Sequence, residues 1–486
     1  MSSSMQTAAQ QRSGTSVVLT VALGTFMCSF DANAVNMALP LMQRTFNCSI
    51  AAVEWVAVAY LLVLSASLLA FGRLADMWGR KRMYVIGFAG FMASSLLSAL
   101  APRVELLIVA RILQGLGASL MMATANAIIV DAVPSSRRGR ALGMTAVAVA
   151  LAACAGPALG GLLATAWGWK SIFIVNLPIG AVGTLLAAKL IGGDVPRAPG
   201  RFDPLGAVVI AGALVALLVS LDLVSGGMAR SVAVWALLAA SAALGALFVG
   251  IERRAASPLL PPRLFSHRVF SAGTAAAAFF YLSLFILVFL GPYFLQGMRR
   301  LSAGASGLVM LPMSAALAVA APISGALSDR LDGRWLSLGG MILVALGEIV
   351  FGSFTAATPV GLILATMTLI GLGMGMFQTP NNSAVMGSVP PDSRGVGGAA
   401  LATTRNLGMA LGEAVAAALL STCMASRGLR LSLEAAAGSA GWNDAFSFAT
   451  RVTCAVAAAA ALAAGLASLR RAAETARPGA RQEARR

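Results

Sequence analysis

The sequence predicts an all-α membrane protein with 14 transmembrane helices, arranged as two pseudo-symmetric six-helix bundles plus two inserted central helices. Three observations support this prediction. First, 58% of the 486 residues are hydrophobic and only 11% are charged, which is more apolar than a soluble protein can bury in its own core. Second, apolar windows long enough to cross a hydrocarbon layer recur along nearly the whole chain. Third, short motifs of the first half return in the second half.

Each apolar window is expected to be a helix, because a helix satisfies its backbone hydrogen bonds within the segment. The windows are 17–39, 50–70, 83–101, 105–130, 141–165, 171–190, 204–224, 231–250, 269–290, 304–326, 336–354, 359–379, 397–420 and 446–468. The predicted organisation is a cytoplasmic tail (1–16), a first six-helix bundle (17–190), two inserted helices (204–250), a second six-helix bundle (269–468) and a basic cytoplasmic tail (469–486).

The positions of the basic residues predict the orientation. Most of the 35 Lys and Arg fall on one side of the membrane if the N-terminus is cytoplasmic, and an excess of basic residues is typical of cytoplasmic loops. Both termini are therefore expected in the cytoplasm of a multi-pass protein of the cytoplasmic (inner) membrane. The net charge of +17 is spread over short loops, so we expect contact with membrane lipid and none with nucleic acid.

No pattern in the sequence predicts catalysis. The five cysteines show no paired spacing, which argues against a disulfide framework or a metal site. The chain contains no nucleotide-binding loop and no catalytic constellation of Ser, His or metal ligands. We therefore expect neither enzyme activity nor a cofactor, and we expect a monomer.

The second half of the chain repeats the first. The stretch "GRLADMWGR" at 72–80 returns as "GALSDRLDGR" at 325–334, and "GLG" at 115 returns at 371. Each Gly-x-Leu-x-Asp loop lies between the second and third predicted helices of its half. Same-direction repeats of six helices are the architecture of transporters whose bundles rock about a site near the membrane midplane.

The first copy of this loop combines turn-forming and charged residues. Gly72 and Gly79 permit a tight turn, while Asp76 can accept hydrogen bonds from Arg80 or from a helix N-terminus. The second copy keeps Gly325 and Asp329 but loses most of the basic cluster. The alternative interpretation is a turn whose basic residues only orient the protein.

Charged residues within predicted spans are candidates for function. Arg111, in "RILQGLGAS", would cost on the order of 3 kcal/mol inside a membrane unless it is paired or reaches water. It either serves a buried site or extends to the nearby membrane surface. Asp31, in "GTFMCSFDANAVNMALP", and Glu413, in "NLGMALGEAVAA", lie near the middle of their spans.

A carboxyl group buried without a partner favours its protonated form and releases the proton when it is exposed to water. When ionised, the same group attracts a lipophilic cation. Asp31 and Glu413 are therefore candidates for proton coupling or cation binding. For Asp31 the alternative is a structural hydrogen bond to Asn33 or Asn36.

One predicted helix carries a proline among glycines. In "CAGPALGG", Pro157 removes a backbone hydrogen bond, while Gly156, Gly160 and Gly161 leave a smooth face. A helix of this kind can bend and pack closely against its neighbours.

Several of these stretches together resemble one known family. "GRLADMWGRKR" resembles the signature loop of the major facilitator superfamily, and the fourteen spans resemble its drug:proton antiporter branch. Further stretches that match this branch, in order, are "DANAVNMALP", "RILQGLGAS", "GPALGG", "WGWKSIFIVNLPIG" and "FDPLG".

The resemblance implies roles for the residues named above. It implies a cytoplasmic latch between the bundles at the Gly-x-Leu-x-Asp loop, proton coupling for Arg111, and an antiporter motif at 156–161. The expected function is multidrug efflux, and hence drug resistance: proton-coupled export of lipophilic, preferentially cationic, drug-like molecules by alternating access. A dedicated exporter of one metabolite or antibiotic is the alternative within transport, and a non-transporting membrane sensor or an intramembrane enzyme is the alternative outside it.

Overall fold

The computed structural model describes residues 2–134, 138–193, 203–225, 228, 231–255, 262–328, 331–389, 394–429 and 440–470. All regular secondary structure in these residues is helical. The first group of helices is α1 (Ser2–Phe46), α2 (Ile50–Trp78), α3 (Arg80–Leu100), α4 (Val104–Ala132), α5 (Arg138–Trp167), α6 (Lys170–Ile174) and α7 (Asn176–Leu190). They are followed by α8 (Pro204–Ser225), α9 (Val232–Arg254) and the short α10 (Pro262–Ser266). The last group is α11 (Arg268–Tyr293), the π-helix η2 (Phe294–Met298), α12 (Ala303–Ser328), α13 (Gly333–Gly352), α14 (Val360–Gly387), α15 (Arg394–Ala425) and α16 (Ala440–Leu469).

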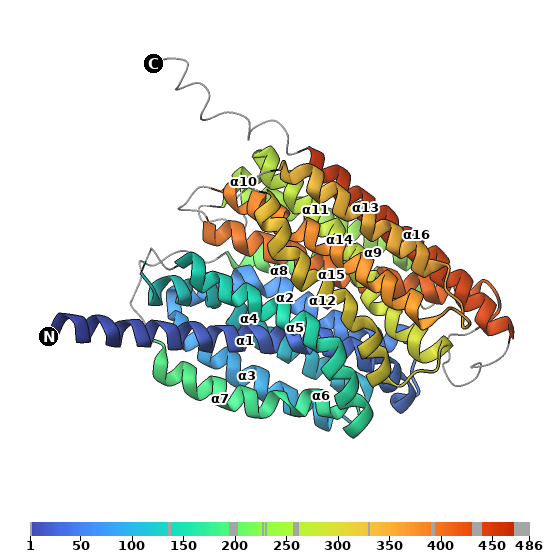
Figure 1. The fold of residues 1–486 in the computed structure, drawn as a ribbon, viewed down its shortest axis with the longest axis horizontal. Helices are drawn as coiled ribbons and strands as arrows, with labels where there is room; N and C mark the ends of the chain where they lie inside the picture. The colour runs from blue at the N-terminus through green and yellow to red at the C-terminus, as the bar shows by residue number, and fades with distance from the viewer. Residues whose placement is uncertain are drawn as a thin grey trace, which may run out of the picture.

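These helices form two bundles that lie side by side (Figure 1). In the first bundle α1 packs on α5, and α4 packs on both α2 and α3. In the second bundle α14 packs on α12 and α13, while α11 packs on α15 and α16. The bundles meet mainly where α5 packs on α12 and where α2 packs on α15, so a central space is bounded by both halves of the repeat.

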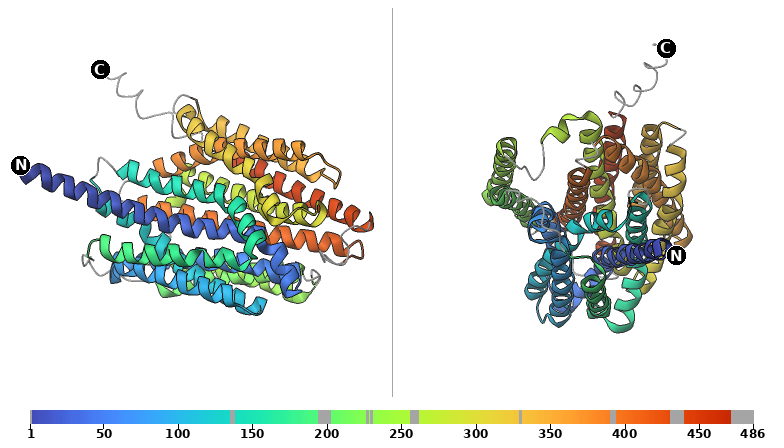
Figure 2. Two further views of the ribbon diagram at one scale, coloured as in Figure 1. Left: turned by 60° about the horizontal axis from the view of Figure 1, so that its bottom comes forward. Right: turned by 90° about the vertical axis from the view of Figure 1, so that its left-hand side faces the viewer.

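The two inserted helices form a peripheral pair. α8 and α9 pack on each other, and α8 also contacts α2 and α15. They lie at the edge of the molecule when it is viewed along the bundles (Figure 2). Trp235 on α9 is 65% exposed, as expected for a helix whose outer face contacts lipid rather than protein.

The number of membrane spans agrees with the prediction only in part. Twelve helices of the described residues are long and apolar enough to cross a membrane, with α6 and α7 together counted as one. α5 supplies a thirteenth if its two segments, which are bent by 41°, are taken as one span. The apolar part of α8, Leu205–Leu221, is shorter. The full set of fourteen spans therefore stays a prediction.

The expected tails also differ in detail. Residues 2–16, predicted as a tail, form the first turns of α1. Of the basic tail predicted at 469–486, only residues 469 and 470 belong to the described part of the chain.

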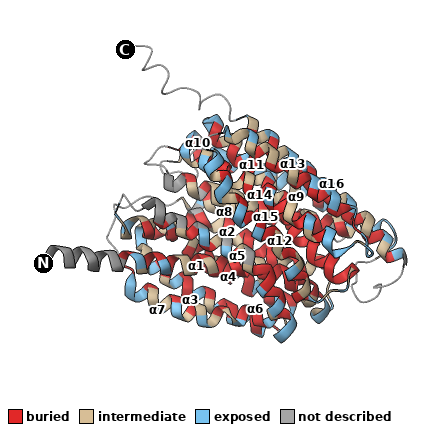
Figure 3. Cartoon of the chain, viewed as in Figure 1, coloured by how far each residue is buried: buried red, intermediate tan, exposed pale blue. Residues whose placement is uncertain are grey.

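Buried and exposed side chains lie on different faces of the helices. Buried side chains gather inside the bundles and at their boundary, while exposed positions lie on the outer faces (Figure 3). Those outer faces carry large apolar side chains, including Leu106 and Val109 on α4 and Leu185 on α7. This pattern fits a lipid environment, in which apolar side chains need no protein cover.

For reference, we call the side that holds the connections 47–49, 168–169 and 299–302 the distal side. The side where α1 begins is the proximal side, which the charge pattern predicts to be cytoplasmic.

Candidate functional site

A buried ion pair occupies the middle of the first bundle. Asp31 on α1 and Arg111 on α4 are both fully buried. The Nη1 atom of Arg111 donates to Oδ2 of Asp31. The sequence predicted a function for both residues without predicting that they pair. The alternatives that it left open, a surface-seeking Arg111 and an Asp31 bonded to Asn33 or Asn36, do not describe this structure.

Three amide and hydroxyl side chains complete the surroundings of Asp31. Its Oδ1 accepts from Gln114 Nε2 at 3.1 Å and from Asn176 Nδ2 at 2.8 Å. Gln114 also donates to Ser95 Oγ at 2.8 Å. The network therefore joins α1, α3, α4 and α7 around one carboxylate.

Arg111 has further contacts on α2. Its Nε donates to the Val56 carbonyl at 2.7 Å, and its guanidinium lies 4.3 Å from the centre of the Tyr60 ring. Its Nη1 also donates to Gln114 Oε1 at 2.6 Å. Its Nη2 has no hydrogen-bond partner among the described residues. One donor of a buried cation is therefore still available to another group.

Glu413 lies across the boundary between the bundles from this network. It is fully buried on α15, and its Oε1 accepts from Asn36 Nδ2 on α1 at 3.0 Å. Its second oxygen, Oε2, has no hydrogen-bond partner among the described residues. Asn36 thus connects the first bundle directly to the candidate proton carrier of the second.

A third buried carboxyl group, Glu348 on α13, accepts a hydrogen bond from Ser283 on α11 at 2.7 Å. At the offset of 253 residues that relates the two Gly-x-Leu-x-Asp loops, Glu348 corresponds to Ser95. Arg111 corresponds to Met367 at the offset of 256 that relates the two "GLG" stretches. The second bundle therefore carries an acid on its third helix where the first bundle has Ser95. On its fourth helix it has a methionine where the first bundle has Arg111.

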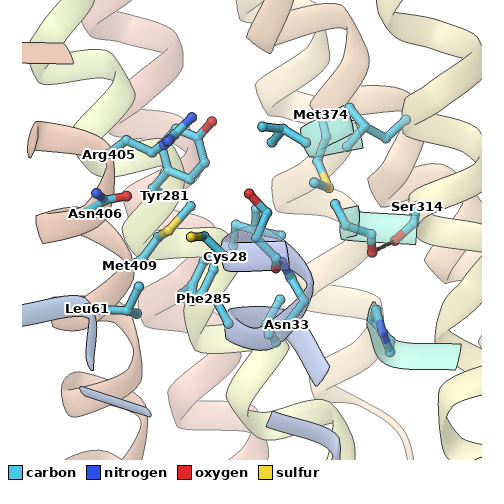
Figure 4. Close-up of a pocket in the computed structure, with 18 of the residues that line it drawn as sticks. Cys28, Asn33, Leu61, Tyr281, Phe285, Ser314, Met374, Arg405, Asn406 and Met409 are labelled. Atoms are coloured by element: carbon cyan, nitrogen blue, oxygen red, sulfur yellow. Dashed lines mark hydrogen bonds between the residues drawn. The ribbon is translucent and has the colours of Figure 1, made fainter. Parts of the chain in front are cut away.

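A cavity of about 980 Å³, measured with its open mouth, lies between the bundles. Cys28 and Asn33 from α1 and Phe285 from α11 lie on its walls (Figure 4). Asp31 and Glu413 are not among its described lining residues. Each lies within one helical turn of a residue that does line the cavity: Asp31 next to Ala32 on α1, and Glu413 four residues after Met409 on α15.

The polar residues of the cavity lie mostly on the second bundle. Arg405 and Asn406 project from α15, and Gln378 on α14 donates to Tyr281 Oη on α11 at 2.7 Å. Arg405 and Tyr281 lie together on one wall in Figure 4. Arg405 is the only charged residue among the described lining residues.

The Gly-Pro motif of α5 packs on α1 within its own bundle and on α12 of the other bundle. A Cβ atom at Gly160 would lie 2.7 Å from Cα of Ala34 on α1, and Gly156 likewise packs on Asn33. Gly161 faces the backbone of Ala303 on α12. The three predicted glycines are therefore needed for close approach, two toward α1 and one toward the other bundle.

Pro157 has a specific partner in this contact. A proline at 157 cannot donate to the carbonyl of residue 153, four positions earlier. The Ala153 carbonyl instead accepts a hydrogen bond from Ser314 Oγ on α12 at 3.0 Å. The acceptor that proline releases in one bundle is thus satisfied by the other bundle.

The described hydrogen bonds between the bundles lie between mid-membrane and the distal side. Besides the two bonds at Glu413 and Ser314, Gln296 donates to the Met37 carbonyl and the Gly304 amide donates to Thr165. The cavity residues Arg405 and Gln378 lie on the proximal side of these bonds.

The Gly-x-Leu-x-Asp loop is organised by Arg80. Its guanidinium donates to Asp76 at 2.6 and 2.9 Å and to Asp131 on α4 at 2.8 Å. Gly79 has a φ of 104°, a conformation that favours glycine, and it connects α2 to α3 directly. A Cβ atom at Gly72 would have only Ala123 within 4 Å, so the predicted role of Gly72 in the turn has no steric basis. All these contacts lie within the first bundle, so the latch between bundles stays a prediction.

The second copy of the loop is organised differently. Asp332 caps α13 by accepting from the Arg334 amide, and it also pairs with the Arg334 side chain. Hydrogen bonding by this guanidinium holds the pKa of Asp332 below its usual range. Gly325 packs on Thr379 of α14, and Asp329 lies outside the described residues. The only basic side chain described in this copy is therefore engaged with its own helix start.

Sequence reasoning missed three parts of the site. Asn176 and Ser95 bind at Asp31 and at Gln114, and Arg405 lines the cavity. Asn176 and Arg405 had a detectable signal, because each is a strongly polar residue inside an apolar window. Ser95 had none, because single serines are common in membrane helices.

Two bundles around a central cavity, with an ion pair buried beside it, define a membrane transport protein. The family model of the Major Facilitator Superfamily matches residues 21–413. The chain belongs to this superfamily.

Relatives with assigned names are similar over most of the chain. The riboflavin transporter RibZ of Clostridioides difficile (strain 630) is 31% identical over 82% of this chain and 86% of its own length. The multidrug resistance protein Stp of Mycobacterium tuberculosis (strain CDC 1551 / Oshkosh) is 32% identical over 84% of this chain and 76% of its own. The tetracenomycin C resistance and export protein of Streptomyces glaucescens is 31% identical over 84% and 76%.

Among solved structures, a bacterial homolog of the human lysosomal transporter Spinster superposes with a TM-score of 0.67. The likeness covers 94% of this chain and 97% of that chain at 17% identity. At this identity it supports the fold alone.

Proposed function

We propose that this chain exports small amphipathic molecules across the cytoplasmic membrane in exchange for protons, by alternating access of the central cavity. The observation that carries the proposal is the arrangement of two buried acids beside that cavity. Asp31 is paired with Arg111, while Glu413 bonds to Asn36 and keeps one oxygen without a partner among the described residues. One acid is thus held by a cation, and the other has none bonded to it in the described part of the chain.

Proton binding changes the balance of this arrangement. A buried carboxyl group is costly in its charged form unless a cation compensates it. A proton that neutralises Asp31 would release Arg111, whose Nη2 already lacks a partner among the described residues. Movement of that guanidinium toward another acceptor would link proton uptake to the positions of α1 and α4. Resistance proteins and a named exporter among the relatives support transport of drug-like compounds.

The cationic preference expected from the sequence has no support in the cavity. It required a carboxylate on the cavity wall, and the described lining carries Arg405 instead. Our proposal therefore omits the cationic preference. It retains the predicted inner-membrane location, the cytoplasmic termini and a monomeric transporter.

Proton exchange can be tested in proteoliposomes that contain a pH-sensitive dye. With an imposed pH gradient, addition of a transported coumarin dye should drive a proton flux that depends on the protein. Asp31→Asn should abolish this flux. Glu105→Gln, which changes an exposed acid at the start of α4, should leave it intact. Equal proton flux in wild type and Asp31→Asn would exclude Asp31 as the coupling residue.

A dedicated exporter of a single compound is the second candidate. It is favoured by the likeness to a named riboflavin transporter. Growth of an efflux-deficient strain on unrelated toxic compounds separates the two candidates. Protection against many compounds supports multidrug efflux, and protection against one supports the dedicated exporter.

A further inference from the structure

We propose that the cavity selects amphipathic anions, and that Arg405 binds their carboxylate or phenolate oxygens. This inference deepens the proposed function and rests on it for the direction of transport, but binding to the cavity can be tested without transport. The carrying observation is a cation on the cavity wall whose own hydrogen-bonding capacity is incompletely used.

Arg405 lies well inside α15, eleven residues after its first residue, Arg394. A guanidinium at such a depth is costly unless it is paired or faces water. Its Nε has no hydrogen-bond partner among the described residues. No salt bridge within the described chain involves it, whereas Arg111 is paired with an acid. A ligand oxygen would supply what the protein does not.

The neighbouring polar groups favour the same ligand chemistry. Asn406 is 3% exposed, and its Nδ2 donor has no partner among the described residues. Gln378 donates to the hydroxyl oxygen of Tyr281, which leaves the hydroxyl proton available to an acceptor. Arg405, Asn406 and Tyr281 thus present donors from α11 and α15 to the same space. Donors grouped around a cation suit an oxygen anion.

The rest of the cavity suits an apolar body. Six methionines are among its described lining residues: Met37, Met122, Met310, Met313, Met374 and Met409. Methionine side chains are flexible and polarizable, and they adapt to differently shaped apolar or aromatic surfaces. Phe285 and Tyr281 add aromatic surface. The wall therefore imposes little shape selection on the body, while the position of Arg405 fixes where the anionic group lies.

A matched set of fluorescent dyes tests this inference. The set is 7-diethylaminocoumarin-3-carboxylate, its neutral amide, and an amide that carries a quaternary ammonium group. Binding to purified protein in detergent is measured by fluorescence anisotropy, and transport is measured in proteoliposomes. Wild type should bind the carboxylate most tightly. Arg405→Gln should weaken carboxylate binding about tenfold or more, the size expected for loss of a charge-assisted hydrogen bond.

Two control variants make the result specific. Arg405→Lys keeps the charge and should retain part of the affinity for the carboxylate. Arg451→Gln removes an exposed arginine on α16 and should change nothing. Arg405→Gln should change the affinity for the neutral amide by less than about threefold, because this dye offers no charge to the guanidinium.

The outcomes separate the two proposals. Tightest binding of the quaternary ammonium dye, no binding of any dye, or equal loss of all three dyes in Arg405→Gln would overturn the anion inference. Binding of the carboxylate that depends on Arg405, without any proton-coupled transport, would support the inference and overturn the proposed function. Proton-coupled export of the ammonium dye that is insensitive to Arg405 would do the reverse.

Discussion

Asn36 on α1 donates its side-chain amide to Glu413 on α15 at 3.0 Å, across the boundary between the two bundles. The remaining oxygen of each side chain, Oδ1 of Asn36 and Oε2 of Glu413, has no hydrogen-bond partner among the described residues. A proton on Glu413 would convert Oε2 from an acceptor into a donor. Glu413 can thus keep its bond from Asn36 whether or not it is protonated. Its Oε2 needs a donor when Glu413 is ionised and an acceptor when it is protonated.

Glu413→Gln should uncouple substrate movement from protons. Glutamine keeps an oxygen that can accept from Asn36, but it cannot change its charge. We expect dye exchange without a pH gradient to continue, and uphill efflux driven by the gradient to fall at least about tenfold. Both are measured in the same proteoliposomes. Unchanged uphill efflux would remove Glu413 from the coupling mechanism.

Arg111→Met should be more destabilising than the double variant Asp31→Asn/Arg111→Met. Loss of the arginine alone leaves an uncompensated carboxylate, which costs about 3–5 kcal/mol in a buried pair. The double variant removes both charges and should recover most of this loss. The free energy of unfolding of detergent-solubilised protein gives the comparison. A double variant that is no more stable than Arg111→Met would show that the pair is not the source of the cost.

Gly160→Ala should impair both stability and transport. The added methyl group would lie 2.7 Å from Cα of Ala34, so α1 and α5 must move apart, at about 1–3 kcal/mol for overpacking. Gly90→Ala on α3 is the matched control, because a Cβ atom there would meet nothing within 4 Å. Thermal unfolding and dye efflux are measured for both. Equal behaviour of the two variants would contradict the close contact of α5 with α1.

Arg80→Gln should change transport more than stability. Its side chain is 23% exposed, and those of its partners Asp76 and Asp131 are 38% and 44% exposed, so the lost pairs should contribute less than about 1 kcal/mol. If the loop latches the bundles in another state of the cycle, efflux should nevertheless fall severalfold. Transport at the wild-type rate would leave Arg80 with a local role only.

The sequence predicted the helical repeat better than it predicted partners. Asp31, Arg111 and Glu413 could be found because charges in apolar windows are rare and costly. That Asp31 pairs with Arg111 could not be found, because the two lie 80 positions apart and only helix packing decides which faces meet. The glycines of α5 were recognised as a packing face, but not which helices they contact.

The lining of the cavity could not be predicted from the sequence either. Arg405 carried a detectable signal, because an arginine inside an apolar window is costly, but the sequence does not show which neighbour its side chain faces. Its place on the cavity wall depends on how α15 is rotated about its axis. That rotation places a cation, and no carboxylate, among the described lining residues of the cavity.

Pro157 also affects the equilibrium between the closed and the open distal side. As long as Ser314 reaches the Ala153 carbonyl, the distal contact keeps a hydrogen bond that it loses when the bundles part, and water must then enter to solvate that carbonyl. One such bond contributes about 1 kcal/mol, roughly a fivefold shift in the ratio of two states. The backbone hydrogen bond that is missing at Pro157 in one bundle therefore weakly favours the closed distal side. Alanine at position 157 would offer its own N–H to the Ala153 carbonyl and so weaken this preference.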